Sequence, residues 1–184
     1  MKKAISKAIL RMFGWKIGTV IEDIPKCVIC VAPHTSNWDF LVGKIAYTAL
    51  GRNANFLIKK DWFFFPLNIW FDWIGGVPVD RSKRTSVTEQ MVEQFNKRET
   101  FQLAITPEGT RKKVKDWKKG FYYIAKSANV PVVMIYIDYK KKEVGYKGVY
   151  HLTGNMEEDI TAIRKYYRDV TACYPENFVQ IWTL

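Results

Sequence analysis

Two short polar turns carry the residues of this chain that are best suited to chemistry. One turn spans residues 33–39 and follows the apolar run 27–32, and the other spans residues 106–111 and follows the apolar run 101–105. In sheets built from parallel strands, groups that follow strand ends gather at one edge of the sheet, where ligands bind. The two turns are therefore candidates for a shared functional crevice.

The first turn contains a histidine and an aspartate five residues apart, His34 and Asp39. Ser36 or Asn37 can cap a helix that begins there, which places Asp39 in its first turn, within reach of the imidazole. A carboxylate bonded to one ring nitrogen leaves the other free as a general base. No serine nucleophile accompanies the pair, so it suits activation of a substrate hydroxyl. The alternative is a capping turn with an incidental histidine.

The second turn and two further strand ends supply cations. Gly109 permits a tight turn or a close approach to a ligand, and Arg111 offers a planar fork for phosphate. Lys59 and Arg81 each lie near the end of another strand-like segment and could join Arg111 in an anion site. A single lysine or arginine at a strand end usually faces solvent. The anion site is therefore predicted from the three cations together.

Strand and helix signals alternate along the whole chain, which predicts an α/β fold: a mixed, mostly parallel central sheet flanked by helices. We expect one domain over residues 1–184, with its core over residues 27–140. The expected strands are 27–32, 55–58, 74–79, 101–106, 132–138, 144–151 and 178–182. The expected helices are 1–14, 37–50, 85–97, 117–128 and 157–167. An aromatic segment over 61–72 is expected to be helical or irregular.

The N-terminal residues form an amphipathic pattern that predicts a short helix associated with a membrane surface, within residues 1–16. Four apolar residues repeat at helical spacing, opposite a basic face without acids: Ile5, Ile9, Met12 and Phe13 against Lys3, Lys7 and Arg11. The alternative is a helix packed on its own domain. The segment Trp62–Trp73 has three open roles: it can line a tunnel for a long apolar ligand, contact a bilayer or belong to the core.

Composition favours a polyanionic partner, and the alternative is a solvated basic surface without a partner. The formal net charge is +11, and the 184 residues include 7 Trp, 10 Tyr and 11 Phe. Aromatic rings beside Lys and Arg favour an anionic membrane surface over nucleic acid, which is not expected. Cys27 and Cys30 form a CxxC, but a buried structural role is favoured over a redox or metal role, in keeping with a reducing cytosol. No uncharged apolar run reaches the ~18 residues of a spanning helix.

Together these residues resemble the glycerolipid acyltransferase family, and most closely its 1-acylglycerol-3-phosphate acyltransferases. Four sequence blocks of that family occur here in order, although Pro33 stands where the family usually has Asn. They are His-x4-Asp (34–39), Gly-x4-Arg (76–81), Glu-Gly-Thr-Arg (Glu108, Gly109, Thr110 and Arg111) and Val-Pro-hydrophobic (130–132, with Pro131).

The resemblance implies a reaction and a site. His34, oriented by Asp39, takes the proton of an acceptor hydroxyl, which attacks an acyl thioester of coenzyme A or acyl carrier protein directly. Lys59, Arg81 and Arg111 hold the acceptor phosphate, and Glu108 and Gly109 shape their loop. A backbone N–H near Ser36 or Gly109 is expected to stabilise the oxyanion.

No metal or other cofactor is implied. The expected product is phosphatidic acid from 1-acylglycerol-3-phosphate, made at the cytoplasmic face of the membrane by a peripheral protein. The same chemistry on another lysolipid, such as a lyso-aminolipid, is the nearest alternative. A non-catalytic basic membrane-binding module is the alternative from another class. The sequence does not determine four further properties: acyl-chain length, the choice of donor, the oligomeric state and the role of residues 141–184.

Overall fold

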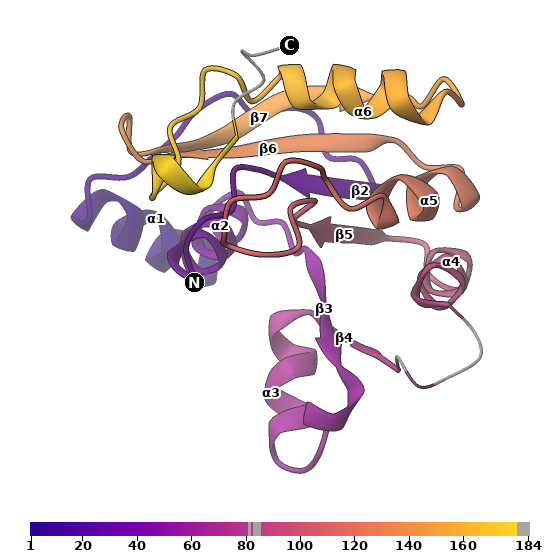
Figure 1. Cartoon of the computed structure of the whole chain (residues 1–184). Helices are drawn as coiled ribbons and strands as arrows, with labels where there is room; N and C mark the ends of the chain where they lie inside the picture. The colour runs from indigo at the N-terminus through magenta and orange to yellow at the C-terminus, as the bar shows by residue number, and fades with distance from the viewer. Residues whose placement is uncertain (81, 83–85, 180–184) are drawn as a thin grey trace.

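A computed structural model describes residues 1–80, 82 and 86–179. Within this part of the chain, the strands form a single sheet in the order β1-β7-β6-β2-β5-β3-β4 (Figure 1). Their bounds are β1 Lys16–Ile17, β2 Lys26–Val31, β3 Asn55–Lys59, β4 Gly76–Val79, β5 Phe101–Ile105, β6 Val132–Asp138 and β7 Glu143–Tyr150. Neighbouring strands are parallel except β6 and β7, which are antiparallel. The predicted mixed, mostly parallel α/β sheet is confirmed.

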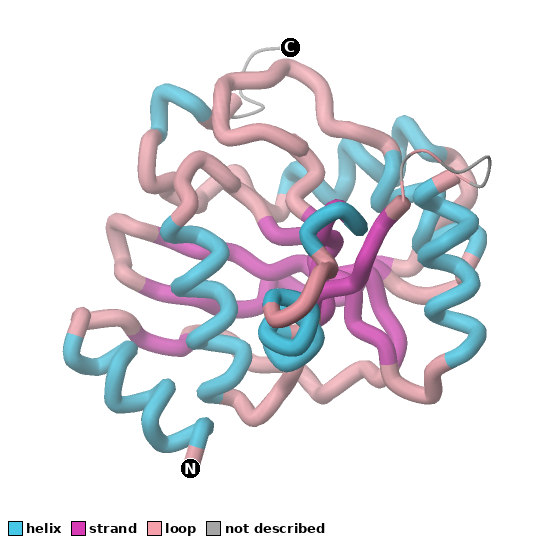
Figure 2. Tube along the Cα trace, turned by 90° about the horizontal axis from the view of Figure 1, so that it is seen from below, coloured by secondary structure: helices cyan, strands magenta, loops and turns pink. Residues whose placement is uncertain are grey.

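Helices cover both faces of the sheet (Figures 1 and 2). Helices α1 (Lys2–Met12) and α2 (Trp38–Ala49) pack on one face, and α4 (Val87–Lys97), α5 (Gly120–Ser127) and α6 (Met156–Lys165) pack on the other. Helix α3 (Leu67–Ile74) and the 3₁₀ turn η1 (Lys60–Trp62) lie between β3 and β4, and a second 3₁₀ turn, η2, spans Pro175–Asn177.

Strand β2 is central because its side chains are apolar on both faces. Cys27 and Ile29 contribute to the core under α1 and α2, whereas Val28 and Cys30 contribute to the core under α4, α5 and α6. Burial raises the pKa of Cys27 to about 12, so its thiol stays protonated. Both cysteines of the CxxC are free and buried, and they serve as small core residues.

Local sequence signals set the helix bounds. Helix α4 begins with a capping box, in which the Ser86 hydroxyl accepts the Glu89 N–H at 3.2 Å and the Glu89 carboxylate accepts the Ser86 N–H at 2.7 Å. Helix α3 ends at Gly75, whose φ of 92° is the left-handed conformation that favours glycine.

Helix α1 packs on its own domain, but not through the predicted apolar stripe. Its buried residues are Ser6 and Leu10, whereas Ile5, Met12 and Phe13 are each more than half exposed. The helix therefore packs on its own domain, as the alternative prediction has it. Its outer side still exposes apolar side chains. None of the described helices is long and apolar enough to cross a bilayer.

The structure differs from the sequence predictions at two places. The expected strand 178–182 is absent at residues 178–179, and its other positions lie outside the described residues. The two-residue strand β1 was not predicted, because so short a strand has no detectable periodicity. The aromatic segment 61–72, expected to be helical or irregular, contains both kinds of structure, because Pro66 separates η1 from α3.

Candidate active site

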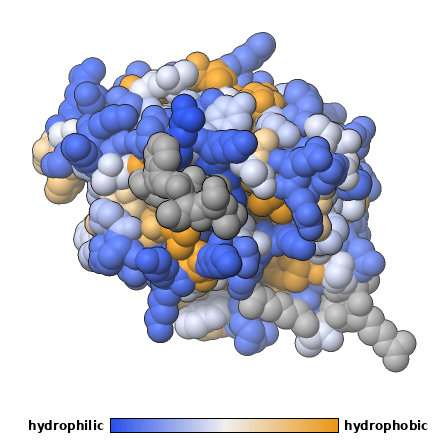
Figure 3. All heavy atoms as spheres, turned by 45° about the horizontal axis from the view of Figure 1, so that its top comes forward, coloured by the Kyte–Doolittle hydropathy of each residue, from blue (hydrophilic) through white to orange (hydrophobic). Residues whose placement is uncertain are grey.

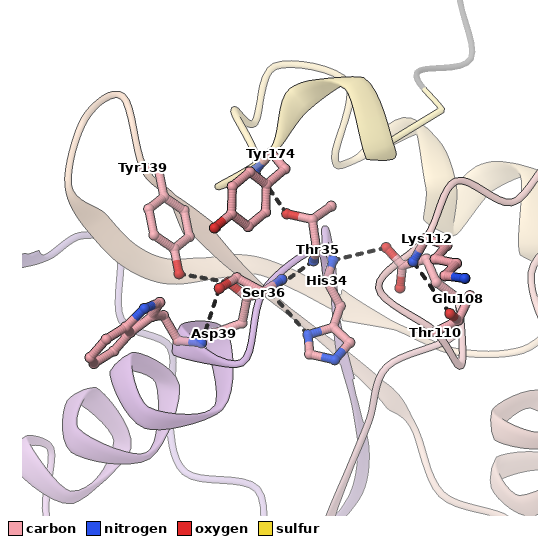
Figure 4. Close-up of polar contacts among 10 residues, drawn as sticks. His34, Thr35, Ser36, Asp39, Glu108, Thr110, Lys112, Tyr139 and Tyr174 are labelled. Atoms are coloured by element: carbon pink, nitrogen blue, oxygen red, sulfur yellow. Dashed lines mark hydrogen bonds and ion pairs between the residues drawn. The ribbon is translucent and has the colours of Figure 1, made fainter.

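Three adjacent parallel strands deliver polar residues to one edge of the sheet. Strand β2 leads into His34, β5 leads into the loop 106–111, and β6 leads into Tyr139; both β5 and β6 pair with β2. Parallel strands bring their carboxyl ends to the same edge, so residues far apart in sequence meet there. Figure 4 shows the resulting cluster of polar contacts.

Asp39 is the centre of this cluster. Its Oδ2 accepts hydrogen bonds from Nδ1 of His34 at 3.0 Å and from the backbone N–H groups of Thr35 and Ser36 at 2.9 Å each. Its Oδ1 accepts the hydroxyl of Tyr139 at 2.6 Å. Asp39 is only 3% exposed, so these donors replace the water that its carboxylate has lost.

The environment keeps Asp39 ionised and orients His34. Burial acts to raise the pKa of Asp39, but the hydrogen bonds from His34, Tyr139 and the Ser36 N–H outweigh it and hold that pKa below its usual value. An ionised carboxylate only accepts, so a neutral His34 ring carries its proton on Nδ1. Nε2 then holds the free lone pair, and no described residue bonds to it (Figure 4).

The second turn contacts the first through Glu108. Oε1 of Glu108 accepts the backbone N–H of His34 at 3.0 Å, while Oε2 is buried without a hydrogen-bond partner among the described residues. Burial is the main reason that the pKa of Glu108 rises to about 7. The protonated form suits this site because it leaves no buried charge, and the contact ties the loop after β5 to the histidine.

A cavity of about 950 Å³ opens beside His34. Its volume falls within the range of roughly 300–1,000 Å³ that is typical of small-molecule sites. The lining is mainly apolar and comes from both sides of the sheet edge, including Val31, Phe40, Phe56, Ile58, Ile105 and Ile135. Its polar residues include His34, Asn37 and Asp39, and its cations are Lys44, Lys59, Arg111 and Lys118. An apolar cavity with a His/Asp pair and cations suits a molecule with a long apolar part and an anionic group.

Comparison with known proteins identifies the family. A family model described as Acyltransferase matches residues 19–138, roughly two thirds of the chain. The chain belongs to the acyltransferase family. The matched region contains β2 through β6 and therefore both turns of the site.

A solved structure has the same fold as this acyltransferase. The crystal structure of the 1-acyl-sn-glycerophosphate (LPA) acyltransferase PlsC from Thermotoga maritima superposes with a TM-score of 0.59 at 17% sequence identity. The match covers 89% of this chain and 76% of that chain. No curated protein gives a significant match to the sequence.

The three cations predicted for the anion site of this acyltransferase differ in their relation to the cavity. Arg111 and Lys59 both line the cavity, but Lys59 also forms an exposed ion pair with Asp61. Arg81 lies outside the described residues. Lys118 lines the cavity and was missed by the sequence analysis, although it is the cation whose stem lies against Gly109. The φ of Gly109 is 62°, a left-handed conformation that favours glycine, and a Cβ there would also meet Cδ of Lys118 at 2.6 Å.

Other predicted motif residues have local roles. Thr110 accepts the Lys112 N–H through its hydroxyl at 3.3 Å, and Ser36 accepts the Trp38 N–H through its hydroxyl at 3.2 Å. Pro131 precedes β6 and lies at the amino-terminal end of this strand, away from the site. Its carbonyl accepts the Val28 N–H at 3.0 Å. Pro131 therefore aligns β6 with β2 and does not contact the cavity.

Two backbone N–H groups in the region expected to supply the oxyanion donor form hydrogen bonds within their own turns. The Ser36 N–H bonds to Asp39, and the Gly109 N–H donates to the Thr106 carbonyl at 3.1 Å. The expectation of an oxyanion donor near Ser36 or Gly109 therefore stays a prediction for the neighbouring backbone N–H groups.

Tyr139 is the site residue that sequence reasoning missed most clearly. It directly follows β6, and the pairing of β6 with β2, which only the structure reveals, puts both strand ends at one edge. The Tyr139 ring packs edge-on against Trp15, with centroids 5.1 Å apart. Burial, together with the hydrogen bond to Asp39, raises its pKa well above the usual value, so the hydroxyl stays a donor to Asp39.

Replacing Glu108 with Gln should change how stability depends on pH. The pKa of Glu108 rises from 4.5 to about 7 on folding, so the native state holds this proton more tightly than the unfolded state between these values. The free energy of unfolding should then fall as pH rises through this window, by up to about 3 kcal/mol. Glu108→Gln keeps an acceptor for the His34 N–H but cannot ionise, so this decrease should disappear.

Urea unfolding of both proteins at several pH values measures the difference. Glu99→Gln is the matched control, because Glu99 is exposed and should retain the wild-type slope. An identical slope in Glu108→Gln and wild type would mean that Glu108 is not protonated in the folded protein.

Proposed function

We propose that this acyltransferase moves a fatty acyl group from an acyl thioester to the free hydroxyl of 1-acylglycerol-3-phosphate, giving phosphatidic acid. The observation that carries the proposal is the position of His34 Nε2, unbonded by any described residue, at an apolar cavity that also carries cations. The fold shared with the LPA acyltransferase PlsC supports the same reaction class. Acyl coenzyme A and acyl carrier protein are both suitable donors.

The proposed mechanism is direct transfer with a general base. The acceptor hydroxyl gives its proton to Nε2 of His34 while its oxygen attacks the thioester carbonyl. Asp39, ionised and bonded to Nδ1, stabilises the imidazolium that forms. The tetrahedral intermediate collapses with cleavage of the C–S bond, and the departing thiolate receives the proton from His34. The products are the ester and the free thiol.

The acceptor phosphate is proposed to bind the cations at the cavity. Arg111 can offer two parallel N–H groups to phosphate oxygens, and Lys118 adds a positive charge beside the same loop. Lys59 extends this positive region from β3, with Arg81 proposed as a further ligand. We also propose that the protein works as a peripheral protein at the cytoplasmic face of a membrane, where its lipid acceptor resides.

Removing Arg111 should weaken recognition of the acceptor phosphate selectively. A hydrogen-bonded charge contributes about 1.5–3 kcal/mol, so Arg111→Ala should raise KM for 1-acylglycerol-3-phosphate by roughly 10- to 100-fold. Transfer to 1-acylglycerol, which differs only by the phosphate, should be slow in both proteins and should change little. Steady-state assays with both acceptors and with both donor types measure this.

The control and the contrary outcomes are specific. Lys113 is a cation near Arg111 in the chain, but it does not line the cavity. The variant Lys113→Ala should therefore retain wild-type KM. An equal loss on both acceptors would show that Arg111 does not recognise phosphate. Transfer to a lyso-aminolipid but not to 1-acylglycerol-3-phosphate would replace the proposed acceptor, and no transfer to any lysolipid would leave a membrane-binding module.

A further inference from the structure

A projecting arm between β3 and β4 exposes many large apolar side chains. The arm comprises residues 60–74, that is η1, the loop 63–66 and α3, and it extends away from the rest of the sheet (Figures 1 and 2). Six of its large side chains are between 54% and 79% exposed: Trp62, Phe64, Phe65, Ile69, Trp70 and Trp73. Apolar patches of this kind on a folded protein mark a surface that another phase or molecule covers.

Helix α3 is apolar on both sides, and this distinguishes it from an ordinary surface helix. Ile69, Trp70 and Trp73 fall on one exposed side, and none of the residues of α3 is buried. Surface helices of globular proteins place polar residues on the outer side. By contrast, the face that carries β7 and α6 is mostly hydrophilic, with apolar side chains in small separate patches (Figure 3).

The apolar surface continues onto the two neighbouring helices. The start of α2 exposes Trp38, Phe40 and Leu41 to between 45% and 61%. Helix α1 meets the arm directly, because Nζ of Lys2 lies 4.4 Å from the centroid of the Trp73 ring. The arm and the outer sides of α1 and α2 therefore belong to one side of the molecule.

Charges around this surface are mainly positive. Helix α1 exposes Lys2, Lys3, Lys7 and Arg11 and contains no acidic residue. The arm has two acidic residues, Asp61 and Asp72; the first pairs with Lys59, and the second lies at the margin of the exposed side of α3. Tryptophan rings flanked by lysines are the combination favoured where the bilayer meets water, and clustered lysines favour anionic lipid.

The apolar surface is continuous with the cavity. Phe40 and Trp62 are exposed, and both also line the cavity, as does Phe71 on the inner side of α3. A lipid that enters from this side passes from one apolar environment to another. Its acyl chain need not cross water on the way to His34.

We propose that the arm is the membrane-inserting element of this acyltransferase: its exposed aromatic side chains enter an anionic bilayer, and the lipid acceptor passes beside them into the cavity. This inference rests on the proposed function for the identity of the lipid. It assigns the main membrane contact to residues 60–74, with α1 supplying flanking charge. It also selects the bilayer role among the three that the sequence left open for the aromatic segment.

The test is vesicle binding by a variant that alters the arm outside the cavity lining. The triple variant Phe65→Ser/Ile69→Ser/Trp70→Ser removes three outward apolar side chains, and it should weaken co-sedimentation with phosphatidylglycerol-containing vesicles by roughly 100-fold. The double variant Tyr123→Ser/Tyr166→Ser removes one exposed aromatic side chain from α5 and one from the residue that follows α6, and it should bind like wild type. Transfer between short-chain substrates dispersed as monomers should remain at the wild-type rate in both variants.

The outcomes separate this inference from the proposed function. Wild-type vesicle binding by the triple variant would overturn the inference, even if acyl transfer is established. A change of oligomeric state without a change of vesicle binding would assign the arm to contact with a second copy. If no acceptor is acylated but the triple variant loses vesicle binding, the arm remains the membrane contact and the proposed function fails. Equal loss of binding in both multiple variants would overturn the assignment to the arm.

Discussion

Replacing His34 with alanine is expected to lower kcat/KM for acyl transfer by about 10²- to 10⁴-fold, the range that general-base catalysis contributes. His34 Nε2 is free of described partners at the cavity, whereas Nδ1 is bonded to Asp39 at 3.0 Å. Without the imidazole, nothing in this arrangement accepts the proton of the acceptor hydroxyl as its oxygen attacks. The effect should be measured by single-turnover transfer from an acyl thioester.

The fold should tolerate this substitution. Asp39 keeps the backbone N–H groups of Thr35 and Ser36 and the hydroxyl of Tyr139 after His34 is lost, so its carboxylate stays satisfied. The cost in unfolding free energy should be about 1 kcal/mol. Vesicle binding should be unchanged, because the exposed apolar surface lies elsewhere.

The second histidine of the chain provides a matched control. His151 follows β7 and is exposed, so His151→Ala should transfer acyl groups at the wild-type rate. Full activity in His34→Ala would refute the general-base role. Equal losses in both variants would point to a general effect of histidine removal, and the mechanism would then need a different proton acceptor.

Sequence alone predicted the parts of the fold whose periodicity is strong. The runs that became β2, β5 and β6 are apolar and bounded by turn residues, so their type and position were clear. Strand order was not predictable, because the register between β2 and β6 depends on packing across the whole sheet. Tyr139 was missed for this reason, since nothing in its local sequence connects it to Asp39.

The candidate site was predictable as a set of residues but not as a geometry. The contact between His34 and Asp39 could be expected because both lie in one turn. The contact between Glu108 and the His34 N–H crosses 74 residues of sequence, and no spacing rule reveals it. The aromatic arm illustrates the opposite limit: its composition was evident, but only the fold decides whether such rings face a core or the exterior.

Replacing Asp39 with asparagine is expected to lower kcat by about 10³-fold or more while leaving KM nearly unchanged. The amide has no charge with which to stabilise the imidazolium that forms as His34 takes the proton, and loss of such a carboxylate acts on the transition state. Asparagine can keep its oxygen toward His34 and the N–H groups of Thr35 and Ser36. Its amino group then faces the Tyr139 hydroxyl, which can accept as well as donate.

Comparison of Asp39→Asn with Tyr139→Phe separates the charge of the carboxylate from its orientation. Tyr139→Phe removes one donor to Oδ1 but leaves the contact between Asp39 and His34, so it should reduce kcat far less than Asp39→Asn. If Asp39→Asn retained wild-type kcat, the carboxylate would be only a cap for its own turn. If both variants lost activity equally, the position of the carboxylate would matter more than its charge. The expected order instead follows from the geometry, because among the described residues only Asp39 forms a hydrogen bond with the ring that must become positive during the reaction.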